Sequence, residues 1–149
     1  MIKLKIVKQQ EGYCGPASLK MILDYYGKNY SQEKLALLTN TTHKEGCAEE
    51  DIVKFAKSIG FKDSYIKKNS SIKEIKNLLK KKTPVIVDWF SPEQAGHYSV
   101  VIKIDKDCIY LADPHFGKMI KHRLDWFEER WFDLPFSKNK CLKEIIVIK

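Results

Sequence analysis

The hydrophobic pattern of this 149-residue chain changes once, at Pro84. Before this proline, apolar residues recur every three or four positions, which is the spacing of an amphipathic helix. After it, short β-branched and aromatic runs alternate with turn residues, which is typical of consecutive antiparallel strands. Helices followed by strands predict an α+β domain, because a doubly wound α/β sheet would alternate the two. No repeat or Gly/Ser-rich linker divides the sequence, so residues 1–149 are interpreted as a single domain.

Helix signals come from the start and stop residues of the periodic segments. Pro16 suits a first helical turn, and Gly27 is a typical stop. Four helices are expected, beginning near Cys14, after Ser31, near Glu49 (with Gly60 at its end) and at the capping box Ser71–Glu74. Strands are expected at PVIVDWF (84–90), HYSVVIKI (97–104), CIYLAD (108–113), KMIKHRL (118–124) and EIIVIK (144–149), with a short helix or turn at DWFEERW (125–131).

The net charge of +8 limits the classes of partner that this chain is expected to bind. Only Arg123 and Arg130 are arginines, and the lysines are spread along the whole sequence. Nucleic-acid surfaces favour arginine or clustered charge, so a solvated lysine-rich surface is the favoured interpretation, with no nucleic-acid partner. An acidic peptide partner stays open.

Residues 1–8 lack the continuous apolar region of a signal peptide, and no apolar run approaches the roughly 20 residues of a membrane span. We therefore expect a cytoplasmic protein without membrane insertion.

The four cysteines, Cys14, Cys47, Cys108 and Cys141, are widely separated and form no Cys-x-x-Cys pair. This spacing predicts neither a zinc site nor, in a reducing compartment, disulfides. We expect no metal or other cofactor, and free thiols of which one is reactive.

Cys14 has the best position for a nucleophile. At the first residue of a helix, unpaired backbone N–H groups and the positive end of the helix dipole favour the thiolate form. Cysteine is also commonly a small buried hydrophobic residue. The segment alone leaves both interpretations open.

A cysteine nucleophile needs a base, and the base needs an acceptor that orients it. His97 lies at the start of one predicted strand, and Asp113 lies at the end of the next. If these strands are antiparallel neighbours, both side chains meet at one edge of the sheet. Taken singly, His97 is a strand-end histidine and Asp113 a turn residue before proline. Taken with Cys14, they favour a catalytic triad.

Acyl transfer also needs donors for the oxyanion. The backbone N–H of Cys14 is one candidate, and the side-chain amide of Gln9 or Gln10 is the other. Trp89 and Gly96 flank the loop that leads into His97 and are predicted to contact substrate. Core packing is the alternative for Trp89.

Five segments of the chain resemble papain-like cysteine peptidases, and most closely the bacteriocin-processing peptidases that remove double-glycine leader peptides. These segments are YCGPASLKMILDYYG, EGCAEEDIVKFAKSIGF, GHYSVVIKID, YLADPHFGK and LDWFEERW, in the order of that family and spanning residues 7–133. The resemblance implies a papain-like fold, with a nucleophile helix packed on an antiparallel sheet. It also implies that Cys14 is the nucleophile, His97 the base and Asp113 the orienting acid.

One position departs from that family. Its oxyanion glutamine precedes the cysteine by six residues, where this chain has Lys8. Gln9 is the favoured substitute, and Gln10 stays open.

The resemblance implies hydrolysis of a peptide substrate through a thioester. It also implies an acidic leader that would suit the lysine-rich surface, and an ABC exporter as partner. Two other functions share the fold: a silent peptide-binding module, and an acyl transferase that uses the same triad.

Overall fold

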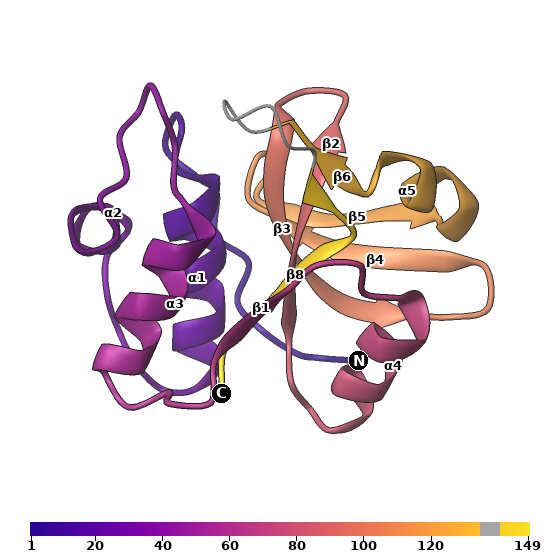
Figure 1. Cartoon of the computed structure of the whole chain (residues 1–149), viewed down its shortest axis with the longest axis horizontal. Coiled ribbons are helices and arrows are strands. Elements are labelled where there is room, and N and C mark those ends of the chain that lie inside the picture. Colours follow the sequence, from indigo (N-terminus) through magenta and orange to yellow (C-terminus); the bar gives the residue numbers. More distant parts are fainter. Residues whose placement is uncertain (135–140) are drawn as a thin grey trace.

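A six-stranded antiparallel sheet separates two groups of helices in the computed structural model, which describes residues 1–134 and 141–149 (Figure 1). The helices are α1 (Cys14–Tyr25), α2 (Gln32–Leu38), α3 (Glu49–Ser58), α4 (Ile72–Lys80) and α5 (Leu124–Arg130). The strands are β1 (Tyr65–Lys67), β2 (Val85–Ser91), β3 (Ala95–Ile104), β4 (Cys108–Asp113), β5 (Lys118–Arg123), β6 (Phe132–Asp133), β7 (Cys141–Leu142) and β8 (Glu144–Val147). The sheet order is β1-β8-β2-β3-β4-β5, and β6 and β7 form a separate pair. The expected α+β class is confirmed, while the short strands β1, β6 and β7 were not predicted.

Local signals explain where the helices begin and end. Gly27 follows α1 with a φ of 79°, a conformation that glycine adopts without strain. The hydroxyl of Ser71 accepts the backbone N–H of Glu74 at 3.1 Å and caps α4. The Glu74 carboxylate binds Lys67 and Ser70 instead of returning to Ser71, so only half of the expected capping box forms.

The sheet is apolar on both faces because each face is covered by helices. Residues that alternate along a strand point to opposite faces. On β2, Ile86 packs into the core shared with α1 and α3, whereas Val87 packs into the core shared with α4 and α5. This double burial explains why the strands appear in the sequence as nearly continuous apolar runs.

The segment before α1 fixes that helix to the sheet. The backbone N–H of Ile2 donates to the carbonyl of Ile102 at 2.8 Å, and the N–H of Gln9 donates to the carbonyl of Pro114 at 2.8 Å. The second bond ties the start of α1 to the turn that follows Asp113. In that turn, a Cβ on Gly117 would lie 2.8 Å from the Cβ of Lys8, so a glycine permits the close approach. The helical half and the sheet therefore meet beside Cys14.

No helix among residues 1–134 and 141–149 combines the length and the apolar character that a membrane span requires.

Candidate active site

Cys14 lies at the first residue of α1, as expected. Its neighbour Tyr13 is the N-cap, and the Tyr13 N–H donates to the carbonyl of Gln10 at 2.9 Å. Because Cys14 opens the helix, its own N–H has no acceptor within the helix. The partly buried thiol faces a cavity of about 500 Å³, whose wall also includes His97 and Gly96. The cavity lies between the helical half and the sheet.

Two loops form the rest of this cavity. Residues 43–48 contribute one wall, and Gln94 contributes to the other from the connection between β2 and β3. The first loop lies against the start of α1, where the ring of His43 stacks on Tyr13 with centroids 4.3 Å apart. At Gly12, with a φ of 76°, a Cβ would lie 2.3 Å from the carbonyl oxygen of His43. Glycine at this position thus lets the loop close one side of the cavity.

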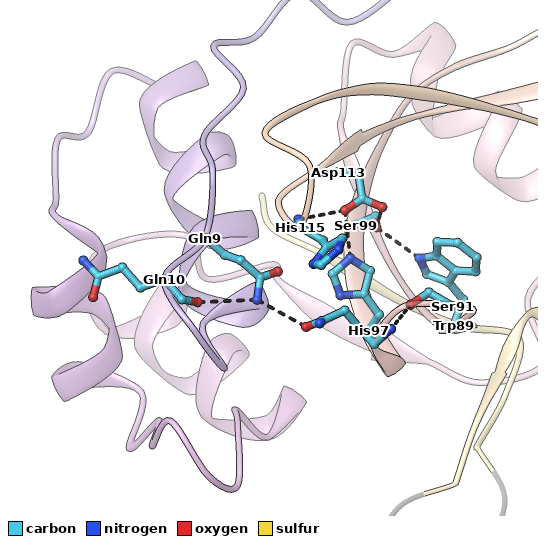
Figure 2. Close-up of polar contacts among 9 residues, drawn as sticks. Gln9, Gln10, Trp89, Ser91, His97, Ser99, Asp113 and His115 are labelled. Carbon is cyan, nitrogen blue, oxygen red and sulfur yellow. Dashed lines mark hydrogen bonds and ion pairs between the residues drawn. The ribbon is translucent and has the colours of Figure 1, made fainter.

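His97 and Asp113 meet at the edge of the sheet, as the strand order predicts (Figure 2). Nε2 of His97 lies 2.9 Å from Oδ1 of Asp113, and the two residues are 1% and 2% exposed. Antiparallel pairing of β3 with β4 places the start of one strand beside the end of the other. The pair is therefore a product of the sheet and does not depend on a loop.

Three donors surround the Asp113 carboxylate. Besides His97, the backbone N–H of His115 donates to Oδ1 at 2.8 Å, and the Ser99 hydroxyl donates to Oδ2 at 3.3 Å. Burial alone would raise the pKa of Asp113, but these bonds, the one from His97 first, hold the pKa below its usual value. Asp113 is therefore an ionised carboxylate inside the protein.

The imidazole of His97 is held in a charged form. Burial lowers its pKa, but the hydrogen bond with Asp113 and the interaction with the Cys14 thiol outweigh burial and raise the pKa to about 9. Nε2 is committed to Asp113, while Nδ1 is buried and forms no hydrogen bond to the part of the chain that the structure describes. Nδ1 is thus the nitrogen through which His97 can exchange a proton with Cys14.

A second thiol, Cys47, borders the same cavity and differs from Cys14. A Cβ on Gly15 would lie 2.6 Å from the Cβ of Cys47, so the two segments are in close contact. Burial raises the pKa of Cys47 to about 11, which keeps this thiol protonated near neutral pH. Because Cys47 ionises poorly, it is a poor nucleophile. Cys14, the thiol that interacts with His97, is therefore the better candidate.

The two glutamines of the sequence point in different directions (Figure 2). The Gln10 amide donates to Glu33, and the Gln10 N–H donates to Gln32 at 3.0 Å, which ties this residue to α2. Gln9 points toward the sheet. Its amide makes two long hydrogen bonds, to the carbonyl of Gln10 at 3.4 Å and to Oε1 of Gln94 at 3.3 Å.

Gln9 lines a neighbouring cavity of about 460 Å³, and Gly12 and Gln94 border both cavities. Of the two glutamines, Gln9 is therefore the one that can turn toward the thiol.

The two predicted substrate contacts have different outcomes. Gly96 lines the cavity, and a Cβ there would lie 2.4 Å from Oδ1 of Asp133, so glycine makes room for that carboxylate. Trp89 is 1% exposed and packs in the core beside Phe127 of α5. The prediction of a substrate contact at Trp89 is corrected: its side chain lies on the same face of the sheet as that of His97, its cross-strand partner, but is buried beneath α5.

Carboxyl groups gather at the cavity, where Glu49 and Asp88 form part of the wall. Among the described residues, Glu49, Asp88 and Glu144 offer oxygens within 4.8 Å of one another, the kind of set that can hold a cation. The hydroxyl of Tyr98 donates to Glu49 at 3.1 Å. Burial raises the pKa of Asp88 well above its usual value, and the nearby carboxyl group of Asp133 raises it further. Protonation of Asp88 would relieve part of the repulsion in this cluster, which is why the neighbouring carboxyl groups raise its pKa.

Sequence reasoning missed Ser99 and Gln94. Ser99 could have been found from strand parity, since it lies two residues after His97 and so points to the same face of β3. Gln94 had no such signal, because its place depends on how the β2–β3 loop folds.

Cys14 and His97 line one cavity and Asp113 is hydrogen-bonded to His97, which is the arrangement expected of a cysteine peptidase domain of the papain-like class. Solved structures support the fold. The peptidase domain of Streptococcus ComA, described as a bi-functional ABC transporter, superposes with a TM-score of 0.75 at 23% identity, covering 99% of this chain and 98% of that one. A double glycine motif protease from an AMS/PCAT transporter, solved in complex with the leader peptide, gives 0.70 at 22% identity, with coverages of 99% and 94%.

The chain belongs to the Peptidase C39 family, whose model matches residues 3–137. It is similar to the transport/processing ATP-binding protein ComA of Streptococcus pneumoniae, with 36% identity over 119 residues, which are 79% of this chain and 16% of that protein. It is also similar to the lactococcin-G-processing and transport ATP-binding protein LagD of Lactococcus lactis, with 31% identity over 141 residues, or 94% and 19% of the two chains. The chain thus spans less than a fifth of the length of these relatives.

Proposed function

We propose that this domain is a cysteine peptidase that removes a leader peptide by cutting after a double-glycine motif. The observation that carries the proposal is the buried His97–Asp113 pair, whose His97 lines the same cavity as the thiol of Cys14. The double-glycine specificity is supported by the likeness to a double glycine motif protease solved with its leader peptide.

The reaction begins from the ion pair in which the Cys14 proton has passed to Nδ1 of His97. The sulfur attacks the scissile carbonyl carbon, and the imidazolium then protonates the leaving amine as the C–N bond breaks. The amine product leaves a thioester on Cys14. Water, deprotonated by His97, hydrolyses that thioester and frees the thiol. Throughout, Asp113 accepts the Nε2–H of His97 and keeps Nδ1 directed to the sulfur.

The oxyanion of each tetrahedral intermediate needs two donors. The backbone N–H of Cys14 is the first. We assign the second to the Gln9 amide, which would leave its long bond with Gln94 and turn toward the substrate. Gln10 is held by Glu33 and is not assigned this role.

We also propose an ABC exporter as the partner of this domain and an acidic leader as its ligand. The exporter is supported by the similarity to transport/processing proteins such as ComA and LagD. The acidic leader is supported by the lysine-rich composition and net charge of +8.

The experiment is incubation of the domain with a synthetic acidic leader peptide that ends in Gly-Gly and is followed by a short cargo, with products identified by mass spectrometry. We expect one cut after the second glycine, no cut in a matched Val-Val peptide, and no turnover by Cys14→Ala. Cys108→Ala, which changes a thiol at the opposite end of β4 from Asp113, is the control and should retain full activity. Unchanged turnover by Cys14→Ala would refute the proposed nucleophile.

A further inference from the structure

The hydrogen-bonded network at the candidate active site continues past Asp113 into the core (Figure 2). Oδ2 of Asp113 lies 3.3 Å from the Ser99 hydroxyl, and that hydroxyl lies 3.0 Å from the indole Nε1 of Trp89. Ser99 is 0% exposed and Trp89 is 1% exposed, so neither can touch a substrate in the cavity.

The chemistry of the groups fixes the direction of every bond in this network. An indole N–H can only donate, so the Ser99 oxygen accepts from Trp89 and its own hydrogen is left to point at Asp113. An ionised carboxylate can only accept, so Asp113 accepts from Ser99 at Oδ2 and from His97 at Oδ1. The carboxylate is thus held at both oxygens, and its rotation would break a bond on either side.

We propose that Ser99, oriented by Trp89, is a positioning residue that holds the Asp113 carboxylate in place and thereby aims Nδ1 of His97 at the Cys14 thiol. The importance of Ser99 for turnover rests on the proposed peptidase function. The effect of Ser99 on the charge and orientation of His97 does not depend on that function.

The surroundings of Trp89 support this role because they anchor the indole from several sides. Its ring packs against Phe127 and Trp126 of α5, with centroids 5.6 and 6.1 Å away. Trp89 is also the direct cross-strand partner of His97, and their rings lie 6.2 Å apart, edge to face. The hydrophobic core therefore holds the indole N–H of Trp89 in place, and this N–H orients the Ser99 hydroxyl.

The titratable groups around the network come from α1, from the turn between β4 and β5, and from β5. Cys14 faces His97 from α1, the His115 ring lies 6.4 Å from the His97 ring, and His122 of β5 lies 5.6 Å from Trp89. Burial lowers the pKa of His122, which keeps this neighbour neutral near pH 7. The charge state of His97 thus depends mainly on Asp113 and Cys14.

The test compares Ser99→Ala, Ser99→Thr and Trp89→Phe in two assays. The first is steady-state cleavage of the double-glycine peptide. The second is the pH dependence of Cys14 alkylation by iodoacetamide, which needs no leader peptide. Ser64→Ala is the matched control, because Ser64 is also a buried serine but binds Phe61 and Lys149 away from the cavity.

We expect Ser99→Ala to lower kcat roughly tenfold with little change in KM, the size of effect that follows from losing one hydrogen bond to a charged group. The alkaline change in Cys14 reactivity, near pH 9 in the native protein, should move to lower pH because a loosened Asp113 stabilises the imidazolium less. Ser99→Thr, which keeps the hydroxyl, should restore most of both properties. Trp89→Phe should have a smaller effect, and none when added to Ser99→Ala.

Other results would overturn the inference. An unchanged alkylation profile in Ser99→Ala, with activity reduced only by the fraction unfolded as in Ser64→Ala, would show that Ser99 merely packs. Additive effects of Ser99→Ala and Trp89→Phe would show that Trp89 does not act through Ser99. If the native protein cleaves no leader peptide but its alkylation profile shifts as expected, the proposed function fails and the positioning role stands.

Discussion

Asp88 and Asp113 are both buried in the same sheet, but the pKa values of their carboxyl groups are shifted in opposite directions. Asp88 on β2 is 3% exposed, and its pKa is raised well above the usual value by burial and then by Asp133, Glu144 and Glu49. Asp113 at the end of β4 is 2% exposed, and its pKa is lowered. Burial is nearly equal at the two sites, so the neighbours make the difference.

The two aspartates lie on opposite faces of the sheet. Asp88 points to the face covered by α1 and α3, where other carboxylates repel its charge. Asp113 points to the other face, where His97, Ser99 and a backbone N–H donate to it. Only an ionised carboxylate can both orient an imidazole and stabilise its charge. The comparison therefore supports the proposal that Asp113 orients His97, and it makes Asp88 a second buried carboxyl group with which to compare it.

The largest expected difference is in turnover of the two asparagine variants. Asp113→Asn should lower kcat by a factor on the order of 10³, because an amide no longer balances the imidazolium and can hold the wrong tautomer. Asp88→Asn should change kcat less than twofold. Steady-state cleavage of the double-glycine peptide at pH 7 measures both, and equal losses in the two variants would break the comparison.

The next largest effect concerns the oxyanion donor. Gln9→Ala should lower kcat by about 10²-fold, the cost of removing one preorganised donor. Gln10→Ala should leave kcat unchanged, since its amide is held by Glu33. Single-turnover kinetics would separate the chemical step from binding. A larger loss in Gln10→Ala than in Gln9→Ala would reverse the assignment.

The smallest effect is on stability, and it has opposite signs at the two aspartates. The raised pKa of Asp88 means that the unfolded chain releases its proton first, so stability falls as pH rises above about 4. Asp88→Asn should remove this loss and raise the melting temperature at pH 8 but not at pH 4. The lowered pKa of Asp113 contributes stability above about pH 4, which is lost as pH falls through its folded value.

Asp113→Asn should consequently lower the melting temperature at pH 8. Thermal unfolding at several pH values tests both signs. A lower melting temperature for Asp88→Asn at pH 8 would show that this carboxyl group is ionised and stabilising.

Much of the fold could be predicted because it follows from local patterns. The apolar spacing around Leu19 and Phe55 is helical, and both residues are buried in the core. The alternation after Pro84 gave β2 to β5 within a few residues of their ends. The strands β1, β6 and β7 have only two or three residues each, too few for a periodic pattern to appear.

The site was predictable where it depends on regular elements. Cys14 begins a helix, and His97 and Asp113 occupy facing ends of neighbouring antiparallel strands. The direction of Gln9 was not predictable, because it depends on the β2–β3 loop that presents Gln94. The buried carboxyl group of Asp88 looked like an ordinary strand residue, since its charge state depends on partners far away in the sequence.

The most direct test of the central claim is an NMR titration of the His97 ring in protein labelled with ¹⁵N-histidine. We predict a pKa of about 9 in the native protein, a similar value in Asp88→Asn, and a marked fall in Asp113→Asn. A His97 that titrates near its ordinary value of about 6.5 in all three proteins would contradict the account.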